Sequence, residues 1–372
     1  MMKIAFCIEK FSNKGGMERV LSCIVNSLSK SFDISVITAY QGKESNAFGL
    51  SNDIEIYDLG VCTGFKTHHI YYNPMMLDYK KKLKVYLCNH HYDFVISMGG
   101  LDLYFLPQIN DGSVKLAWFH FNFNVFYSFC NRNSIYCKIV AWALTQRRIL
   151  SAKRFDGIIT ISKSEQRLWR KHCKNVECIY NPLAIRVNKT TSHSVKSAIA
   201  VGRLDYVKGF DLLIEAWNKV AQIHNDWKLD IYGEGSQRDS LVKKIEEMGL
   251  KGKIKLCGNT QKISEEYCAH SLFVLSSRTE AFPLALIESM ACGLPIVAYN
   301  CAPSIRELVH EGKNGIIVTP VGNTERLADA ICNLIDNEIE RKRMGGYSQK
   351  LSKAYDIEVI VQQWEKLLSN YS

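Results

Sequence analysis

The sequence predicts an α/β protein built from two domains, each a parallel β-sheet with helices on both faces. Short apolar runs rich in β-branched residues alternate with helical segments along almost the whole chain. That alternation is typical of parallel sheets, because a helix must connect one parallel strand to the next. The chain has 372 residues, a length at which two domains, each with its own core, are expected.

The first half is expected to form one domain over residues 1–185. A strand at 4–8 leads into a tight loop at Gly15-Gly16, and a helix should run over 17–30. Further strands are expected at 34–38, 94–97, 116–119 and 157–161. The polar, irregular stretch 181–195 has the composition of a segment that joins two domains.

The second half is expected to form a domain over residues 186–355, followed by a last helix within 356–372. Helices should lie between its strands, with one at 323–336. Six short apolar runs predict the strands, at 197–202, 228–232, 254–257, 272–276, 294–299 and 315–318. The sequence shows no internal repeat.

Composition and charge narrow the class of protein. The 47% hydrophobic and 23% charged content is that of a globular protein, and no apolar run is long enough to span a membrane. Thirteen cysteines without a Cys-x-x-Cys pair favour neither a zinc site nor a disulfide framework. We therefore expect a reducing, cytoplasmic setting.

The net charge of +10 is unevenly distributed. Residues 1–185 hold 23 Lys and Arg against 14 Asp and Glu, whereas residues 186–372 hold 24 against 23. Lys80, Lys81, Lys82 and Lys84 and the stretch 147–154 supply much of this excess. It indicates either solvated helix faces or attraction to an anionic membrane surface. No recognisable nucleic-acid module accompanies it.

The segment from Trp118 to Trp142 is dense in aromatic residues and precedes the basic stretch. A helical hairpin packed into the core of the first domain is the slightly favoured interpretation. The alternative is an interfacial patch that meets lipid.

Two glutamates, Glu280 and Glu288, are the most informative residues of the chain. Glu280 follows the strand expected at 272–276, and Glu288 lies in a helix that Pro283 should open. A helix start presents backbone amides that suit a phosphate, here those of Ala281, Phe282 and Leu284. Carboxylates beside a phosphate suit sugar hydroxyls. The competing interpretation makes Glu280 a loop acid and Glu288 a solvated helix residue.

Two cations follow another strand of the same half. Arg203 comes directly after the strand at 197–202, and Lys208-Gly209 opens the next helix. If this strand lies beside the strand that precedes Glu280, the cations form a clamp for a pyrophosphate. A solvated turn is the alternative.

These motifs, in this order, resemble glycosyltransferase family 4, the retaining nucleotide-sugar transferases with two Rossmann-like domains facing across a cleft, the GT-B fold. The resemblance covers nearly the whole chain. Its elements are Gly15-Gly16, His120, Ser162, Asn181-Pro182, Gly202-Arg203-Leu204, Lys208-Gly209, Ile231 to Gly235, Leu256-Cys257-Gly258 and the two glutamates. The usual Gly-x-Gly-Pro ends as Gly233-Glu234-Gly235-Ser236, which is a mild departure.

The resemblance implies a role for each matched residue. Arg203 and Lys208 would hold the donor diphosphate, Glu288 the ribose hydroxyls, and Glu280 the transferred sugar. His120 would contact that sugar or its reacting face, and the backbone at Gly15-Gly16 would approach the phosphate. Glu280, His120, Arg203 and Lys208 are thus the expected catalytic residues. The last helix would cross back onto the first domain, which would carry the acceptor.

The chain contains no Asp-x-Asp pair, the usual metal-binding motif of many sugar transferases; Asp53-Ile-Glu55 is only a weak approximation to one. We therefore expect no metal site and no cofactor. Arg203, Lys208 and the helix-start amides would neutralise the leaving diphosphate in place of a metal. No residue is an obvious covalent nucleophile.

The function predicted from the sequence is a retaining, metal-independent transfer of a hexose or N-acetylhexosamine. A UDP-sugar is favoured over a GDP-sugar, and the acceptor would be a lipid-linked saccharide in bacterial O-antigen or capsule synthesis. The enzyme would be cytoplasmic and peripheral on the inner face of the plasma membrane. The alternatives are a sugar-nucleotide epimerase of the same fold and a non-catalytic nucleotide-sugar binding protein. A nicotinamide oxidoreductase is a distant third, because the Gly15 loop lacks the full Gly-x-Gly-x-x-Gly fingerprint.

Overall fold

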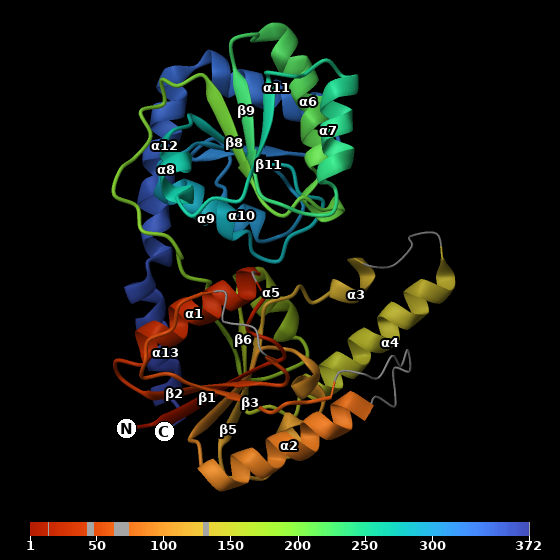
Figure 1. Ribbon diagram of the computed structural model, residues 1–372, viewed down its shortest axis with the longest axis vertical. Coiled ribbons are helices and arrows are strands. Elements are labelled where there is room, and N and C mark those ends of the chain that lie inside the picture. The colour runs from red at the N-terminus through yellow and green to blue at the C-terminus, as the bar shows by residue number, and fades with distance from the viewer. Residues whose placement is uncertain (14, 43–47, 63–73, 129–133, 372) are drawn as a thin grey trace. The chain divides into compact units, whose positions relative to one another are not determined.

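The computed structural model describes residues 1–371 except 14, 43–47, 63–73 and 129–133. It divides the chain into two compact units (Figure 1). Unit 1 comprises Met1–Pro182 and Ile357–Ser372, and unit 2 comprises Leu183–Asp356. The sequence placed the divisions at 185/186 and 355/356.

Unit 1 contains a seven-stranded parallel sheet in the order β3-β2-β1-β4-β5-β6-β7. Its strands are β1 (Lys3–Ile8), β2 (Asp33–Thr38), β3 (Glu55–Asp58), β4 (Phe94–Ser97), β5 (Val114–Phe119), β6 (Gly157–Thr160) and β7 (Val176–Cys178). Its helices are α1 (Gly16–Leu28), α2 (Pro74–His90), α3 (Val125–Ser128), α4 (Ile135–Ala152), α5 (Lys163–Trp169) and α13 (Ile357–Ser369), with short 3-10 turns η1 (Leu101–Tyr104) and η2 (Leu106–Gln108). The inner strands are buried on both faces, which explains their nearly continuous apolar sequences.

The last helix, α13, belongs to unit 1 because of its apolar stripe. Ile360, Trp364 and Leu368 recur at helical spacing and are buried. The Trp364 ring lies 6.0 Å from that of Phe6 in β1 and 4.8 Å from that of Trp118 in β5. The helix therefore covers the middle of the sheet beside α1 (Figure 1).

Unit 2 contains a six-stranded parallel sheet in the order β10-β9-β8-β11-β12-β13. Its strands are β8 (Ser197–Val201), β9 (Lys228–Tyr232), β10 (Ile254–Gly258), β11 (Leu272–Leu275), β12 (Ile296–Tyr299) and β13 (Gly315–Val318). Its helices are α6 (Phe210–Ile223), α7 (Arg238–Glu247), α8 (Ile263–Cys268), α9 (Leu284–Ala291), α10 (Ile305–Leu308), α11 (Thr324–Asp336) and α12 (Glu338–Ser352), with 3-10 turns η3 (Tyr206–Lys208) and η4 (Lys353–Tyr355).

The predicted α/β class with two parallel sheets is confirmed. Each sheet also has one point where the strand order reverses, between β1 and β4 in unit 1 and between β8 and β11 in unit 2. The connections on either side of such a point diverge and leave a crevice at the carboxyl ends of the two strands. In open α/β sheets this crevice is where ligands bind.

Three local expectations need correction. The strands β3 and β7 were missed, because both are short and lie at the sheet edges, where exposed residues break the apolar run. The stretch after Pro182 is not a free linker: Thr191 donates from its backbone N to Cys292 O and from its hydroxyl to His270 O, so it is packed on unit 2. Finally, α9 begins at Leu284, since Pro283 has an extended ψ of 101° and occupies the N-cap.

The aromatic segment does not form a core hairpin throughout. Trp118 and Phe119 are buried in β5, as a core position requires. However, Tyr127, Tyr136 and Trp142 are exposed. The core interpretation is therefore wrong for α4, because the apolar side chains near its N-terminal end face away from the sheet that would bury them.

Candidate functional site

The residues expected to bind a nucleotide-sugar in unit 2 emerge where its strand order reverses. Arg203 and Lys208 follow β8, and Glu280 follows β11. These two strands are neighbours in the sheet, with Ala198 paired to Leu272 and Ile199 to Phe273. The neighbour relation that the clamp requires is thus confirmed. We call Arg203, Lys208, Glu280 and Glu288 the unit 2 cluster.

An ion pair joins the two sides of the unit 2 cluster. Lys208 Nζ lies 2.7 Å from Glu280 Oε1, and the Ser277 hydroxyl donates to the same oxygen over 2.7 Å. The loop of Lys208 is held by a second contact, from Ser276 Oγ to Lys208 O at 3.0 Å. A lysine ammonium has three donors, so Lys208 can hold Glu280 and still bind an anionic ligand.

A glycine makes this close approach possible. Gly209 has a φ of +64°, in the left-handed region, and a Cβ there would lie 2.2 Å from Ser276 O. Any side chain at this position would push the loop after β8 away from the loop after β11. Gly209 therefore keeps Lys208 within reach of Glu280.

Arg203 is presented differently from Lys208. Its guanidinium lies 3.1 Å from Asp205 Oδ2, but 77% of the side chain is exposed. An exposed pair of this kind contributes little to stability. The exposure of Arg203 is thus suited to binding an anion from solution rather than to holding the fold.

Glu288 lies in the second turn of α9 and is buried. Tyr267 of α8 donates its hydroxyl to Glu288 Oε2 over 3.1 Å, which orients the carboxylate. Ahead of it, Ala281, Phe282 and Leu284 surround the helix start, whose first amides have no partner within the helix itself. The Phe282 side chain is buried near Tyr355, with ring centroids 6.0 Å apart. Only the backbone of Phe282 is therefore suited to contact a ligand.

The glycine-rich segment after β9 braces the loop that carries Arg203. Leu204 N donates to Glu234 O over 2.9 Å, and Gly202 N donates to Tyr232 O over 3.0 Å. A Cβ on Gly233, whose φ is +139°, would lie only 1.9 Å from Gly202 O. Gly233 is needed for this backbone contact. Ser236, where the sequence departs from the usual Gly-x-Gly-Pro motif, takes no part in it.

In unit 1, Gly15 is the N-cap of α1 and Gly16 its first residue. Ser162 caps α5, because its side chain accepts from Glu165 N over 3.2 Å. Asn181 is buried at the end of unit 1. The structure thus shows a local structural role for Ser162. It begins α1 at Gly16, one residue before the start of the helix expected at 17–30.

His120 directly follows β5 and is buried. Its ring lies 4.3 Å from that of Trp118, and its Nε2 has no hydrogen-bond partner among the residues that the structure describes. Burial lowers the pKa of His120 to about 3, so the ring is neutral near pH 7. It can exchange a hydrogen bond with a ligand but cannot act as a cation.

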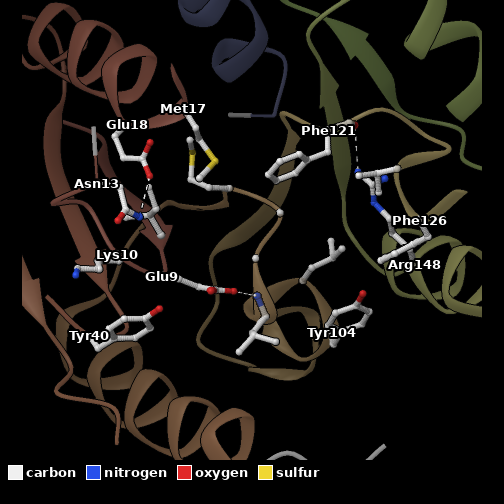
Figure 2. A pocket seen from close by; sticks show the side chains of 17 residues that line it. Glu9, Lys10, Asn13, Met17, Glu18, Tyr40, Tyr104, Phe121, Phe126 and Arg148 are labelled. Atoms are coloured by element: carbon white, nitrogen blue, oxygen red, sulfur yellow. Dashed lines mark hydrogen bonds between the residues drawn. The ribbon is translucent and has the colours of Figure 1, made fainter. Parts of the chain in front are cut away.

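A cavity of about 440 Å³ lies at the reversal point of the unit 1 sheet (Figure 2). We call it the unit 1 cavity. Its walls come from the ends of β1 and β4, the start of α1, η1 and the segment of α3 and α4. The polar and aromatic side chains that line it are Glu9, Lys10, Asn13, Glu18, Tyr40, Tyr104, Phe121, Phe126 and Arg148.

The polar groups of the unit 1 cavity are held in place by neighbouring backbone and side chains. Glu9 Oε1 accepts from Leu101 N over 2.8 Å, and Glu18 Oε1 accepts from Asn13 Nδ2 over 3.3 Å (Figure 2). Burial raises the pKa of the Glu9 carboxyl, although the hydrogen bond from Leu101 opposes that shift. Arg148 donates to Asn122 O over 2.8 Å. Carboxylates and amides among aromatic rings suit a ligand rich in hydroxyl groups.

Residues 184–351, which lie within unit 2, match the family model of the glycosyl transferases group 1. An uncharacterized glycosyltransferase of Haemophilus influenzae is 29% identical over 374 residues, covering 99% of this chain and all of that protein. The chain is a glycosyltransferase of the GT-B type.

Two further relatives match along their whole length. A Campylobacter jejuni α-1,4-N-acetyl-D-galactosaminyltransferase, named for an undecaprenol-diphosphate-linked saccharide, is 24% identical over 99% of both chains. The structure of Anabaena Alr3699/HepE in complex with UDP and glucose superposes with a TM-score of 0.76 at 21% identity, covering 99% of this chain and all of that one. At that identity the superposition shows the fold of the glycosyltransferase alone.

Sequence reasoning missed several residues that shape the site of this glycosyltransferase. Arg278 forms a two-pronged ion pair with Asp211 at 2.7 and 2.6 Å, and lies over the Tyr206 ring. Burial would raise the pKa of Asp211, but the bonds and charge of Arg278 lower it. Tyr267 was also missed. Nothing local marks these residues, since their partners are distant in sequence.

Glu9 could have been found. It directly follows the first strand, and a polar residue at the carboxyl end of a parallel strand beside a reversal point is a candidate ligand contact. The sequence alone does not reveal which strand lies next to β1. The point where the strand order of the unit 1 sheet reverses can therefore be identified only from the sheet order in the structure.

Proposed function

We propose that this glycosyltransferase moves a hexose or N-acetylhexosamine from a nucleoside-diphosphate sugar, UDP-linked rather than GDP-linked, to a lipid-linked saccharide. The transfer retains the anomeric configuration and needs no metal. The pathway is bacterial polysaccharide synthesis, of the O-antigen or capsule kind. The observation that carries the proposal is the unit 2 cluster, with Lys208 paired to Glu280 beside Arg203 at the reversal point of the sheet.

The unit 2 cluster matches the charges of such a donor. Departure of a nucleoside diphosphate builds negative charge on the β-phosphate, and Arg203 and Lys208 would neutralise that charge together with the first amides of α9. Glu288 would accept hydrogen bonds from the two ribose hydroxyls, with Tyr267 keeping it oriented. Glu280 would accept one from the transferred sugar while Lys208 limits the repulsion between Glu280 and the phosphate.

His120 and Gly15-Gly16 complete the proposed donor contacts from unit 1. The buried Nε2 of His120 lacks a partner among the described residues, and such a group is costly unless a ligand supplies one. Because the ring is neutral, it would form a hydrogen bond with a sugar hydroxyl without adding charge. The backbone at the start of α1 would approach the phosphate. No side chain is assigned as a covalent nucleophile.

The unit 1 cavity is the proposed site of the acceptor saccharide. Its carboxylates and amides suit hydroxyl groups, and its rings suit the apolar faces of a sugar. The printed name of the Campylobacter jejuni relative supports a lipid-diphosphate-linked acceptor. A Glu9→Gln variant should raise KM for the acceptor while the affinity for UDP stays unchanged. Equal KM values for both enzymes would remove the cavity from the acceptor site.

The proposed location is the cytoplasm, with peripheral contact of unit 1 to the inner face of the plasma membrane. The basic composition of residues 1–185 supports this contact. In the described part of the chain, no helix is long and apolar enough to cross a membrane.

A mass-spectrometric screen of UDP- and GDP-sugars tests the proposal. Each donor is incubated with the purified chain, with and without a lipid-diphosphate-linked saccharide, and the anomeric configuration of any product is read by NMR. Acceptor-dependent transfer with retention is the expected result. Release of a rearranged sugar without acceptor would identify an epimerase, and donor binding without any turnover would identify a non-catalytic binding protein.

A further inference from the structure

Helix α4 presents an apolar face to solvent. Ile135, Tyr136, Ile139, Trp142 and Leu150 are 75%, 76%, 59%, 57% and 60% exposed, and we call these five residues the α4 face. In a helix with 3.6 residues per turn they fall on one side. Figure 1 shows the N-terminal end of α4 pointing away from the sheet of unit 1. Single exposed apolar residues are ordinary, but several on one side of a helix indicate an interaction surface.

A second stripe of α4, which adjoins the α4 face, fixes the helix to unit 1. Ala141, Thr145, Ile149 and Ala152 are buried there. Arg148 on the same side donates to the backbone at Asn122, and its guanidinium lies 4.5 Å from the centre of the Phe119 ring. The α4 face is therefore distinct from the stripe of α4 that packs on the core of unit 1.

The charged residues of α4 and of the three positions after it all have one sign. Residues 134–155 contain Lys138, Arg147, Arg148, Lys153 and Arg154 and no acidic residue. Lys138, Lys153 and Arg154 are exposed. An exposed apolar stripe with tyrosine and tryptophan, flanked by cations, is the pattern of a helix that lies in the interface of an anionic bilayer.

We propose that α4 docks unit 1 on an anionic lipid bilayer, with Ile135, Tyr136, Ile139 and Trp142 inserted at the headgroup boundary. The flanking cations contact lipid phosphates, and α4 lies in the membrane plane without spanning it. The reason for such docking rests on the proposed function, in which the unit 1 cavity binds a lipid-linked acceptor. Arg148, on the other side of α4, lines that cavity. A docked α4 therefore holds the cavity close to the lipid headgroups.

The lysine group of α2 is the weaker candidate for this contact. Lys80 Nζ donates to Gln108 Oε1 over 2.6 Å, and Lys82 Nζ lies 2.6 Å from Gly60 O and 3.1 Å from Asp78. Half of that group is thus already engaged within unit 1. Leu77 and Val85 on α2 are exposed apolar residues as well, which makes α2 a matched control for α4.

Trp142 supplies a direct probe. The chain has six tryptophans, and the other five, Trp118, Trp169, Trp217, Trp227 and Trp364, are buried. The full chain is titrated with vesicles of phosphatidylglycerol and phosphatidylethanolamine, and with neutral phosphatidylcholine vesicles, while fluorescence and sedimentation are recorded. Anionic vesicles should shift the emission to the blue, brominated lipids should quench it, and Trp142→Phe should abolish both changes. Binding should weaken steeply as salt rises.

A triple variant, Ile135→Gln, Ile139→Gln and Trp142→Gln, should bind anionic vesicles at least about 100-fold more weakly, because three inserted side chains are lost. The control, Leu77→Gln with Val85→Gln, should bind like the wild type. Vesicle binding without a change at Trp142, or an equal loss in the α2 control, would overturn the proposal. So would a blue shift without lipid that grows with protein concentration, since a second copy would then cover the face. UDP release with a water-soluble acceptor should stay normal in the triple variant, which separates this test from that of the proposed function.

Discussion

Replacing Lys208 by methionine tests the proposed chemistry of the unit 2 cluster. The methionine keeps most of the alkyl stem, which packs close to Gly202, and removes only the charge and its hydrogen bonds. Loss of one group that stabilises a developing oxyanion costs about 2.7–4 kcal/mol of transition-state stabilisation. We therefore expect kcat to fall by about 10²- to 10³-fold.

The same substitution also leaves Glu280 without its cation. The Glu280 side chain is only 9% exposed and keeps the bond from Ser277. A buried carboxylate that loses one partner costs about 1–3 kcal/mol of stability, equivalent to a fall of a few degrees in the unfolding temperature at this domain size. A loss of activity by itself would thus not distinguish a catalytic cation from a structural one.

A double variant separates the two effects. Lys208→Met combined with Glu280→Gln removes both charges, so the unfolding temperature should return most of the way to that of the wild type. Turnover should stay low, because the cation that meets the diphosphate and the carboxylate that accepts from the sugar are both absent. Arg203→Ala should lower turnover by about 10²-fold with no change in unfolding temperature, since its side chain is exposed. The assay is UDP release on a verified donor, beside thermal unfolding. Near-normal turnover in Lys208→Met would refute the diphosphate assignment.

Four further outcomes are expected. Glu288→Ala should weaken UDP binding in calorimetry by about 10-fold or more with a smaller effect on kcat, because ribose contacts act in ground and transition states alike; unchanged binding would contradict the role of Glu288. Activity should survive excess chelator, and a complete loss restored by magnesium or manganese would contradict the metal-independent mechanism. Because the folded pKa of His120 is depressed to about 3, the unfolded chain binds more protons below about pH 6.5. The stability of the wild type relative to His120→Phe should therefore fall by up to about 1.4 kcal/mol per pH unit on acidification, measured by urea unfolding. Asp102 should show the opposite sign, because burial raises its pKa to about 7. The stability of the wild type relative to Asp102→Asn should be lost as pH rises from about 4, the usual pKa of an aspartate, to about 7. A flat profile for either variant would refute the corresponding pKa.

Much of the unit 2 cluster could be predicted from the sequence. Parallel strands end at one edge of a sheet, so residues that directly follow two such strands meet if the strands are neighbours. Arg203 and Glu280 satisfy that condition because β8 and β11 pair. The partners that set the geometry could not be predicted. The ion pair of Asp211 and Arg278 joins residues 67 positions apart in the chain. The hydrogen bond from Tyr267 to Glu288 joins residues 21 positions apart. No local sequence pattern links the partners of either pair.

The sequence by itself determined the α/β class, the division into two halves, and the residue types of the unit 2 cluster, because alternating apolar periods and strand-end positions are local properties. Only the tertiary structure decided what covers each apolar surface. Trp118 and Trp142 belong to the same aromatic segment, yet one is buried beneath α13 and the other is exposed on α4. Periodicity specifies which side of a helix is apolar, whereas burial depends on whether a distant element packs against that side. The unit 1 cavity could not be predicted for the same reason, because it depends on which strands become neighbours. It forms where β1 and β4 meet and the strand order reverses.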